Sequence, residues 1–153
     1  MFNIVLVNPE IPPNTGNISR TCAVTGTRLH LIRPLGFEIN DKTLKRAGLD
    51  YWKDLDVSYY DSFEELEAKY SDGRFFLTST HAVRSYADVE YRDGDFLVFG
   101  RETAGLGPEL LTRRAKDAIH IPMRHDQRSL NLSNSAAIVL YEALRQTGFQ
   151  GLE

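Results

Sequence analysis

The chain has 153 residues and a net charge of −3, with 42% hydrophobic and 25% charged residues. These values are typical of a water-soluble globular protein, and the length leads us to expect a single domain over 1–153. One cysteine excludes an internal disulfide framework and a zinc site built from several cysteines. The four histidines have no ligand-like spacing, so we expect no metal.

Targeting and membrane signals are missing from this sequence. The longest apolar runs, such as FLVFG at 96–100, are far too short to span a bilayer. The N-terminus, MFNIVLVNPE, lacks the basic start and the cleavage site of a secretory signal and has the pattern of a first strand. We expect a cytoplasmic protein with no membrane contact.

Acidic residues are concentrated in one segment. Residues 50–72 contain eight of the 21 acidic residues but only two of the 18 basic ones. The rest of the chain is therefore basic overall, which permits a nucleic-acid interface without indicating one.

Short apolar runs alternate with helical patterns along the chain. Strands are predicted at 2–7, 28–32, 56–60, 75–78, 95–100 and 118–121. Helices are predicted at 14–25, 41–48, 62–70, 107–115 and 131–147. Gly26 is the expected C-cap of the first helix, and Gly107-Pro108 opens the fourth. The predicted fold is α/β, with a mainly parallel sheet and helices on both faces.

Three polar loops follow predicted strands, at 8–20, 100–107 and 121–134. Ligands of open parallel sheets bind beyond the carboxyl ends of the strands. We therefore expect the functional site where these three loops meet.

The first loop is NPEIPPNTGNISRT. Asn14 is a good N-cap, and Asn14, Asn17 and Thr21 fall on one helical face with Arg20 at its edge. Polar groups beside a helix N-terminus form a ready phosphate site, in which an arginine can clamp the phosphate. For Arg20 taken alone, a solvated surface position is the commoner case.

The second loop is GRETAGLGP. Gly100, Gly105 and Gly107 allow backbone conformations and close approaches that other residues forbid. Glu102 would be costly there unless it bonded loop amides or a ligand. The loop matches neither GxGxxG nor GxxxxGK[ST], and a glycine-rich turn with a structural glutamate explains it equally well.

The third loop runs into a helix as IPMRHDQRSLNLSNSAAIVLYEAL. Its core stripe is predicted to contain Leu132, Ala136, Val139, Leu140 and Ala143. Two asparagines and three serines crowd the helix entry, although one cap, either Ser129 or Asn131, would suffice. Such mixed polar and apolar groups favour a ligand with a flat apolar part and polar edges.

These three loops, in this order, resemble the three motifs of the SPOUT methyltransferases, in the branch that methylates the ribose 2′-oxygen of RNA. The likeness is greatest to the small enzymes that modify the tRNA wobble nucleotide without an added RNA-binding domain. GFEINDKTLKRAGLDYW at 36–52 also resembles that subfamily, although Arg101 stands where some members carry proline. The resemblance covers nearly the whole chain. It implies a C-terminal trefoil knot, a homodimer whose partner completes each site, and S-adenosyl-L-methionine as cofactor.

The resemblance also implies particular site residues. The positions implied for cofactor binding are Leu77 or Thr78, Gly100, Glu102, Ile121, Met123, Ser129, Leu130 and Asn134. The residues expected to orient the ribose hydroxyl and the cofactor are Asn14, Asn17, Glu102, Ser133 and Asn134. In the family, the arginine at the position of Arg20 is the proposed catalytic base. An arginine is almost always charged in proteins, so we favour Arg20 as a positioner and charge stabiliser.

The expected substrate is the anticodon stem-loop of tRNA, methylated at the wobble nucleotide 34, a cytidine or modified uridine. Lys42, Lys45 and Arg46 share one face of a predicted helix and are candidate phosphate contacts, although a solvated charged face is commoner. Further candidates for RNA contact are Arg124, Arg128 and Tyr141, the last of which can instead pack at a dimer interface. The alternatives are the same chemistry at another tRNA or rRNA position, and a non-catalytic RNA-binding module.

Overall fold

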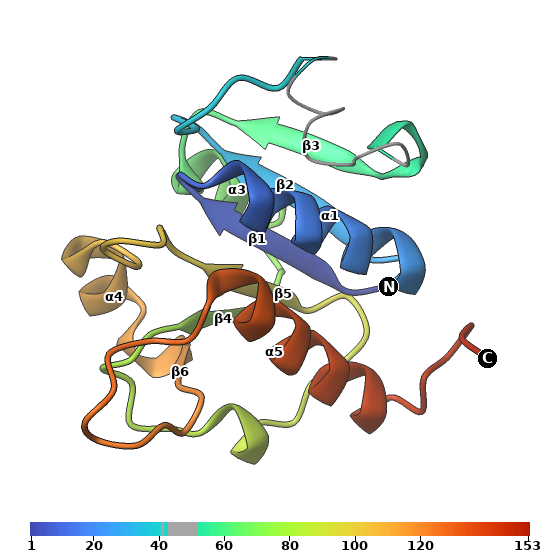
Figure 1. Ribbon diagram of the computed structural model, residues 1–153. Helices are drawn as coiled ribbons and strands as arrows, with labels where there is room; N and C mark the ends of the chain where they lie inside the picture. The colour runs from blue at the N-terminus through green and yellow to red at the C-terminus, as the bar shows by residue number, and fades with distance from the viewer. Residues whose placement is uncertain (41, 43–51) are drawn as a thin grey trace.

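The computed structural model describes residues 1–40, 42 and 52–153. Its strands are β1 (Asn3–Val7), β2 (Arg28–Ile32), β3 (Val57–Tyr60), β4 (Phe75–Thr78), β5 (Phe96–Phe99) and β6 (Ala118–Ile119). They form one six-stranded sheet in the order β3-β2-β1-β5-β4-β6 (Figure 1), and every neighbouring pair is parallel. The predicted parallel sheet is confirmed.

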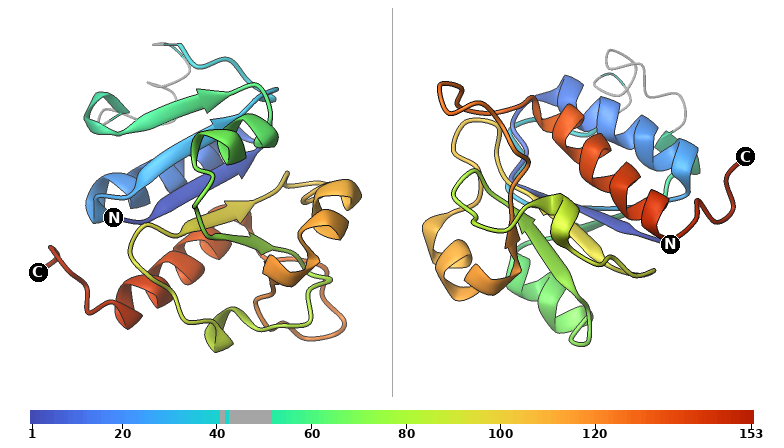
Figure 2. Two further views of the ribbon diagram at one scale, coloured as in Figure 1. Left: turned by 180° about the vertical axis from the view of Figure 1, so that it is seen from behind. Right: turned by 90° about the horizontal axis from the view of Figure 1, so that it is seen from below.

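Helices cover both faces of this sheet, as predicted. Helices α1 (Pro12–Thr25) and α5 (Leu132–Gln146) lie side by side on one face (Figure 2). Helix α3 (Phe63–Lys69) packs on the other face, and α4 (Pro108–Arg113) contributes side chains to the same apolar cluster. Single-turn 3₁₀ helices occur at Trp52–Asp54, Tyr86–Asp88 and Ala115–Asp117. The helix predicted at 41–48 lies outside the described residues except for Lys42.

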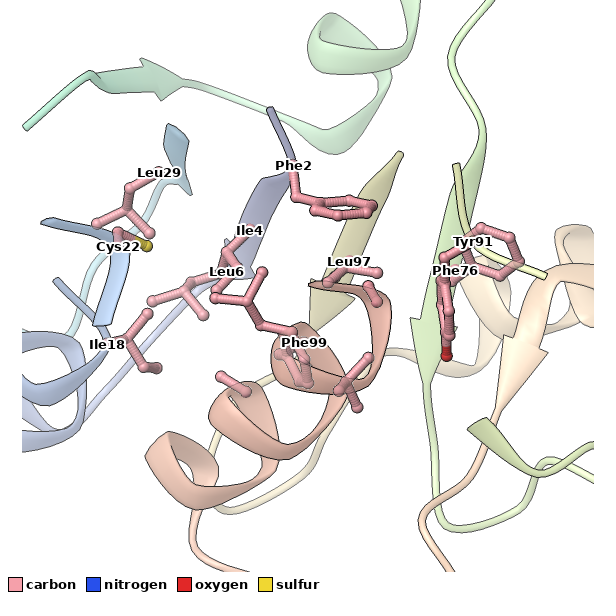
Figure 3. Close-up of a cluster of buried hydrophobic side chains, with 14 of the residues drawn as sticks. Phe2, Ile4, Leu6, Ile18, Cys22, Leu29, Phe76, Tyr91, Leu97 and Phe99 are labelled. Atoms are coloured by element: carbon pink, nitrogen blue, oxygen red, sulfur yellow. The ribbon is translucent and has the colours of Figure 1, made fainter. Parts of the chain in front are cut away.

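The strands are largely apolar because both faces of the sheet are buried. Along β1, Ile4 and Leu6 point into the cluster beneath α1 and α5, whereas Val5 points into the cluster on the α3 side. Figure 3 shows Ile4 and Leu6 beside Leu97 and Phe99 of β5. These four side chains are at most 1% exposed. Each contributes roughly 1.5–3 kcal/mol relative to an exposed position.

The start of α1 corrects one prediction. The helix begins at Pro12 rather than Asn14, and its N-cap is Ile11, which makes no side-chain capping bond. Prolines suit the first helical turn because the N–H they lack would have no acceptor within the helix. Asn14 therefore lies inside the first turn and is buried. At the other end, Gly26 has φ 68° and caps the helix as predicted.

The C-terminal elements agree with the sequence patterns, except that β6 ends at Ile119 instead of reaching residue 121. In α5 the predicted core stripe is buried at Ala136, Val139, Leu140 and Ala143, and only Leu132 is half-buried. Asn131, rather than Ser129, is the N-cap of this helix.

None of the described helices is long and apolar enough to cross a membrane. Within 1–40, 42 and 52–153 there is also no cluster of three or more His, Cys, Asp or Glu side chains that could hold a metal ion.

Candidate functional site

A cavity of about 540 Å³ opens at the carboxyl edge of the sheet. Its walls come from the first turn of α1 and from the loops that follow β4, β5 and β6. The strand order reverses between β1 and β5, and ligands of open α/β sheets bind at such a switch point. The volume lies within the range of small-molecule sites. The three loops predicted from the sequence therefore do meet at one cavity.

The loop after β5 is a tight hairpin. Arg101 and Gly105 exchange two backbone hydrogen bonds of 3.2 and 2.8 Å. A Cβ atom on Gly100 would overlap the carbonyl carbon of Gly105 and the amide nitrogen of Leu106. Gly105 has φ 63°, which a side chain would strain. The glycines are therefore needed for the hairpin to fold back over the end of β5.

Glu102 is held by the N-terminus of α1. Its carboxylate accepts hydrogen bonds from the backbone amides of Glu10 at 2.9 Å and Ile11 at 2.6 Å, and from Asn14 Nδ2 at 3.3 Å. A negative charge at a helix N-terminus is stabilising. These bonds support the interpretation of Glu102 as a structural glutamate that also lines the cavity.

A second glutamate completes the link in the opposite direction. Glu10 Oε1 accepts from the backbone amide of Thr103 at 3.2 Å and from its hydroxyl at 2.7 Å. The hydrogen bonds from Thr103, and to a smaller extent the charge of Arg101, lower the pKa of Glu10 below its usual value. We call Glu10, Glu102 and Thr103 the two-glutamate clasp, because it ties the hairpin to the start of α1.

The network continues into the C-terminal helix. Asn131 Nδ2 donates to Asn14 Oδ1 at 3.1 Å, which links the first turn of α1 to the N-cap of α5. Asn131 Oδ1 in turn accepts from the amides of Ser133 and Asn134 at 2.9 and 3.2 Å, and from the Ser133 hydroxyl at 2.6 Å. One hydrogen-bonded chain therefore fixes the hairpin, α1 and α5 relative to one another.

The interior of the cavity combines apolar walls with one polar group that lacks a partner. Phe99, Leu106 and Ile121 are buried and line it. The hydroxyl oxygen of Thr78, which also lines the cavity, is buried without a hydrogen-bond partner. A buried polar group without a partner is costly, so this hydroxyl is suited to a ligand that has both an apolar and a hydrogen-bonding part.

The structure separates the predicted site residues into two groups. Those that line the cavity are Asn14, Thr78, Gly100, Glu102, Ile121, Met123, Arg128, Ser129 and Leu130. Those that do not line it are Asn17, Arg20, Lys42, Leu77, Arg124, Ser133, Asn134 and Tyr141. Lys45 and Arg46 lie outside the described residues.

Residues outside the cavity have different surroundings. Leu77 is fully buried in the core on the α3 side, and Arg124 forms an ion pair with Asp126 at 3.2 Å. Arg20 and Asn17 are exposed on α1, and Tyr141 is 45% exposed on α5.

Several lining residues were not predicted from the sequence. Those with polar or exposed side chains include Ile11, Ser79, Thr80, His81, Arg101 and Thr103. The polar run Ser79-Thr80-His81 directly follows a predicted strand, and this position could have indicated that the run belongs to the site. Nothing local indicated Glu10, whose role depends on a hydrogen bond across 93 positions of sequence.

A parallel sheet with a cofactor-sized cavity at its switch point defines the class of ligand-binding α/β domains. Comparison with known proteins narrows this class. The profile of the SpoU rRNA Methylase family matches residues 1–141, and the chain belongs to this family.

Close relatives share the whole chain. The tRNA (cytidine(34)-2′-O)-methyltransferase of Saccharophagus degradans is 50% identical, over 99% of both chains. A crystal structure from Bacillus anthracis superposes with a TM-score of 0.95 and 51% identity, covering 100% of this chain and 98% of the other. A structure described for 2-OH methylation of C/U34 on tRNA has a TM-score of 0.89 and 46% identity, over 96% of both chains.

A more distant structure contains a cofactor. The SpoU methyltransferase AviRb of Streptomyces viridochromogenes, solved in complex with AdoMet, has a TM-score of 0.81 and 25% identity. The match covers 95% of this chain and 57% of that one.

Proposed function

We propose that this protein transfers a methyl group from S-adenosyl-L-methionine to the ribose 2′-oxygen of nucleotide 34 of tRNA, in the cytoplasm. The observation that carries the proposal is the full-length likeness, at 50% identity, to an enzyme named for that reaction. The cavity supports it, because apolar walls and the unpartnered Thr78 hydroxyl suit a cofactor with a flat base and polar edges.

The cofactor would be held by Thr78, by the backbone of the hairpin from Gly100 to Leu106, and by the backbone of the segment from Ile121 to Leu130. When bound, S-adenosylmethionine supplies an electrophilic methyl group. The contribution of the protein is then to align the ribose hydroxyl with that methyl group and to exclude competing water. A hairpin whose position is fixed by the two-glutamate clasp meets the need for alignment.

Arg20 is proposed to act on the RNA side of the site. The hydroxyl must lose its proton as it attacks, and a fixed positive charge beside it stabilises the developing negative charge. Arg20 lies six residues beyond Asn14 on α1, about 9 Å along a helix axis. We therefore propose that the reacting hydroxyl lies between the cavity of one protomer and Arg20 of a second copy in a homodimer. Asn17, Ser133 and Asn134 are assigned to the same RNA-facing side.

The reaction can be tested directly. The protein is incubated with S-adenosylmethionine and unmodified tRNA, followed by nuclease digestion and mass spectrometry of the nucleosides. We expect a new 2′-O-methyl pyrimidine that maps to position 34, and no product with Arg20→Ala. A methylated nucleotide at another tRNA or rRNA position would show that the reaction is 2′-O-methylation but that nucleotide 34 is not its target. RNA binding without affinity for S-adenosylhomocysteine would indicate a non-catalytic module instead.

The shared site has its own test. Arg20→Ala removes the proposed RNA-side charge, and Gly100→Ala disrupts the cofactor hairpin, so each variant alone should be inactive. If each site combines residues of two copies, mixing the variants after mild dissociation restores part of the activity, since some heterodimers contain one intact site. Mixtures that stay inactive, with both variants folded by circular dichroism, would place Arg20 and the cavity of one copy in the same site.

We also propose that the C-terminal segment is threaded as a trefoil knot. The chain leaves β6 at the sheet edge, and α5 then packs beside α1 and β5, across the sheet from that edge. Mechanical stretching from both ends tests this, because an unknotted chain extends to about 3.3–3.6 Å per residue. A knotted chain stays measurably shorter, and full extension would contradict the proposal.

The remaining RNA contacts, at Lys42, Lys45, Arg46, Arg124 and Tyr141, stay predictions. Substituting each residue and measuring tRNA affinity would test them.

A further inference from the structure

Arg101 and Arg128 share an unusual setting. They line the same cavity from two different loops, and both are exposed. Neither forms an ion pair or a side-chain hydrogen bond with another described residue. The sequence had indicated Arg128 for RNA contact but not Arg101.

Most other arginines of the described chain have an acidic partner within ion-pair distance. These are Arg28, Arg33, Arg74, Arg113, Arg114, Arg124 and Arg145. The contrast matters because an arginine that is already paired has less charge to offer a ligand. The two unpaired guanidinium groups at the cavity are therefore available to bind a ligand.

The described acidic groups near the cavity form no ion pair with these arginines. Glu102 is the acidic residue that lines it, and its oxygens accept three N–H bonds from the start of α1. Glu10 and Arg101 interact electrostatically without an ion pair, and Glu10 Oε1 accepts both hydrogen bonds from Thr103. Both guanidinium groups at the mouth of the cavity are therefore left without an ion-pair contact to a described residue, and their N–H donors face outward for a ligand.

We propose that Arg101 and Arg128 hold backbone phosphates of the RNA at the mouth of the cavity, so that the target ribose is placed over the cofactor. This inference rests on the function proposed above. S-adenosylmethionine carries a sulfonium, an ammonium and one carboxylate, so it is itself a net cation that two free arginines would repel. A polyanion is the complementary ligand, and a planar guanidinium matches a phosphate with two parallel hydrogen bonds.

The salt dependence of RNA binding provides the test. The affinity for an RNA anticodon stem-loop is measured by fluorescence anisotropy over a series of salt concentrations. The proteins compared are the wild type, Arg101→Gln, Arg128→Gln and the double variant. Each lost phosphate contact should reduce the slope of log affinity against log salt by about 0.7–0.9. The double variant should lose about twice that amount.

Arg92→Gln is the matched control. Arg92 is also exposed and makes no ion pair with a described residue, but it precedes β5 at the opposite end of the sheet. The substitution removes the same unit of charge away from the cavity. We expect its salt slope to equal that of the wild type.

A second measurement separates the RNA from the cofactor as the ligand. The affinity for S-adenosylhomocysteine, measured by calorimetry, should be unchanged in all variants, and the KM for tRNA should rise in the two cavity variants with little change in kcat. Weakened binding of S-adenosylhomocysteine would overturn the inference, since the arginines would then hold the cofactor carboxylate. A slope equal to that of Arg92→Gln would also overturn it. Failure of the proposed function appears differently, as a wild-type protein that binds RNA but methylates no tRNA.

Discussion

At Gly100 the absence of a side chain decides whether the hairpin after β5 can close. A methyl group there would overlap the backbone of Gly105 and Leu106, neither of which is a flexible side-chain end. We predict that Gly100→Ala lowers the affinity for S-adenosylhomocysteine at least tenfold, as measured by calorimetry, because the hairpin must shift. The matched control is Gly107→Ala, at which an added Cβ meets no atom within 4 Å and φ is −64°. Equal losses in the two variants would contradict this explanation.

The two-glutamate clasp acts at the scale of whole elements, because it joins the hairpin after β5 to the start of α1. In Glu102→Gln the side-chain amide keeps one acceptor oxygen but replaces the other by a donor, which faces a backbone N–H. We predict a loss of about 1–3 kcal/mol in the free energy of unfolding, measured with urea, and weaker cofactor binding. Glu90→Gln is the control, since Glu90 is exposed and makes no side-chain bond with a described residue. A Glu102→Gln variant as stable as this control would show that the clasp contributes nothing.

The same valine-to-alanine substitution can be compared at a buried position on the central strand β5 and at an exposed position outside it. Val98 is fully buried, whereas Val83 is 96% exposed in the segment after β4. Val98→Ala should cost roughly 2 kcal/mol of unfolding free energy from lost burial and the remaining cavity. Val83→Ala should change it by less than about 0.5 kcal/mol. Chemical denaturation of both variants measures the difference, and similar values would contradict the observed burial.

For the molecule as a whole, one buried histidine makes stability depend on pH. His30 is 1% exposed, with its Nε2 2.9 Å from Asn3 Oδ1 and its Nδ1 3.1 Å from the Tyr60 hydroxyl. Burial lowers the pKa of His30 to about 4. In the unfolded chain the value is about 6.5, so between these values the unfolded state takes up a proton that the folded state does not. The contribution of His30 is therefore complete above about pH 6.5 and is lost as the pH falls towards 4.

The expected loss is about 2–3 kcal/mol of unfolding free energy between pH 7 and 4.5. His30→Gln isolates it, because the carboxylates that also titrate are common to both proteins. The stability difference between wild type and variant should shrink as the pH falls. A constant difference would show that folding does not lower the pKa of His30.

A feature of this structure could be predicted from the sequence when neighbouring residues encode it, and could not when it depends on residues far apart in the chain. The strands were predictable because runs such as FNIVLV are apolar on both faces, and the site was predictable because its loops follow strand ends. The predicted start of α1 was wrong because asparagine is a common N-cap residue and Asn14 fits that pattern. The helix in fact begins two residues earlier, at Pro12. The clasp and the Asn14–Asn131 bond join residues about a hundred positions apart, and no periodicity encodes such pairs.

The Asn14–Asn131 bond spans 117 positions, and this has a consequence for biosynthesis. When the ribosome has made β1, α1 and β5, the emerging chain still lacks the segment from Ile121 to Asn131, which forms one wall of the cavity. A nascent or prematurely terminated chain that lacks this segment therefore has no complete cavity, however well its first strands have paired. Long-range pairing of this kind also slows folding, since distant segments must meet before they gain their contacts. The cavity is therefore completed only when the first turn of α5 has been made and has packed against α1.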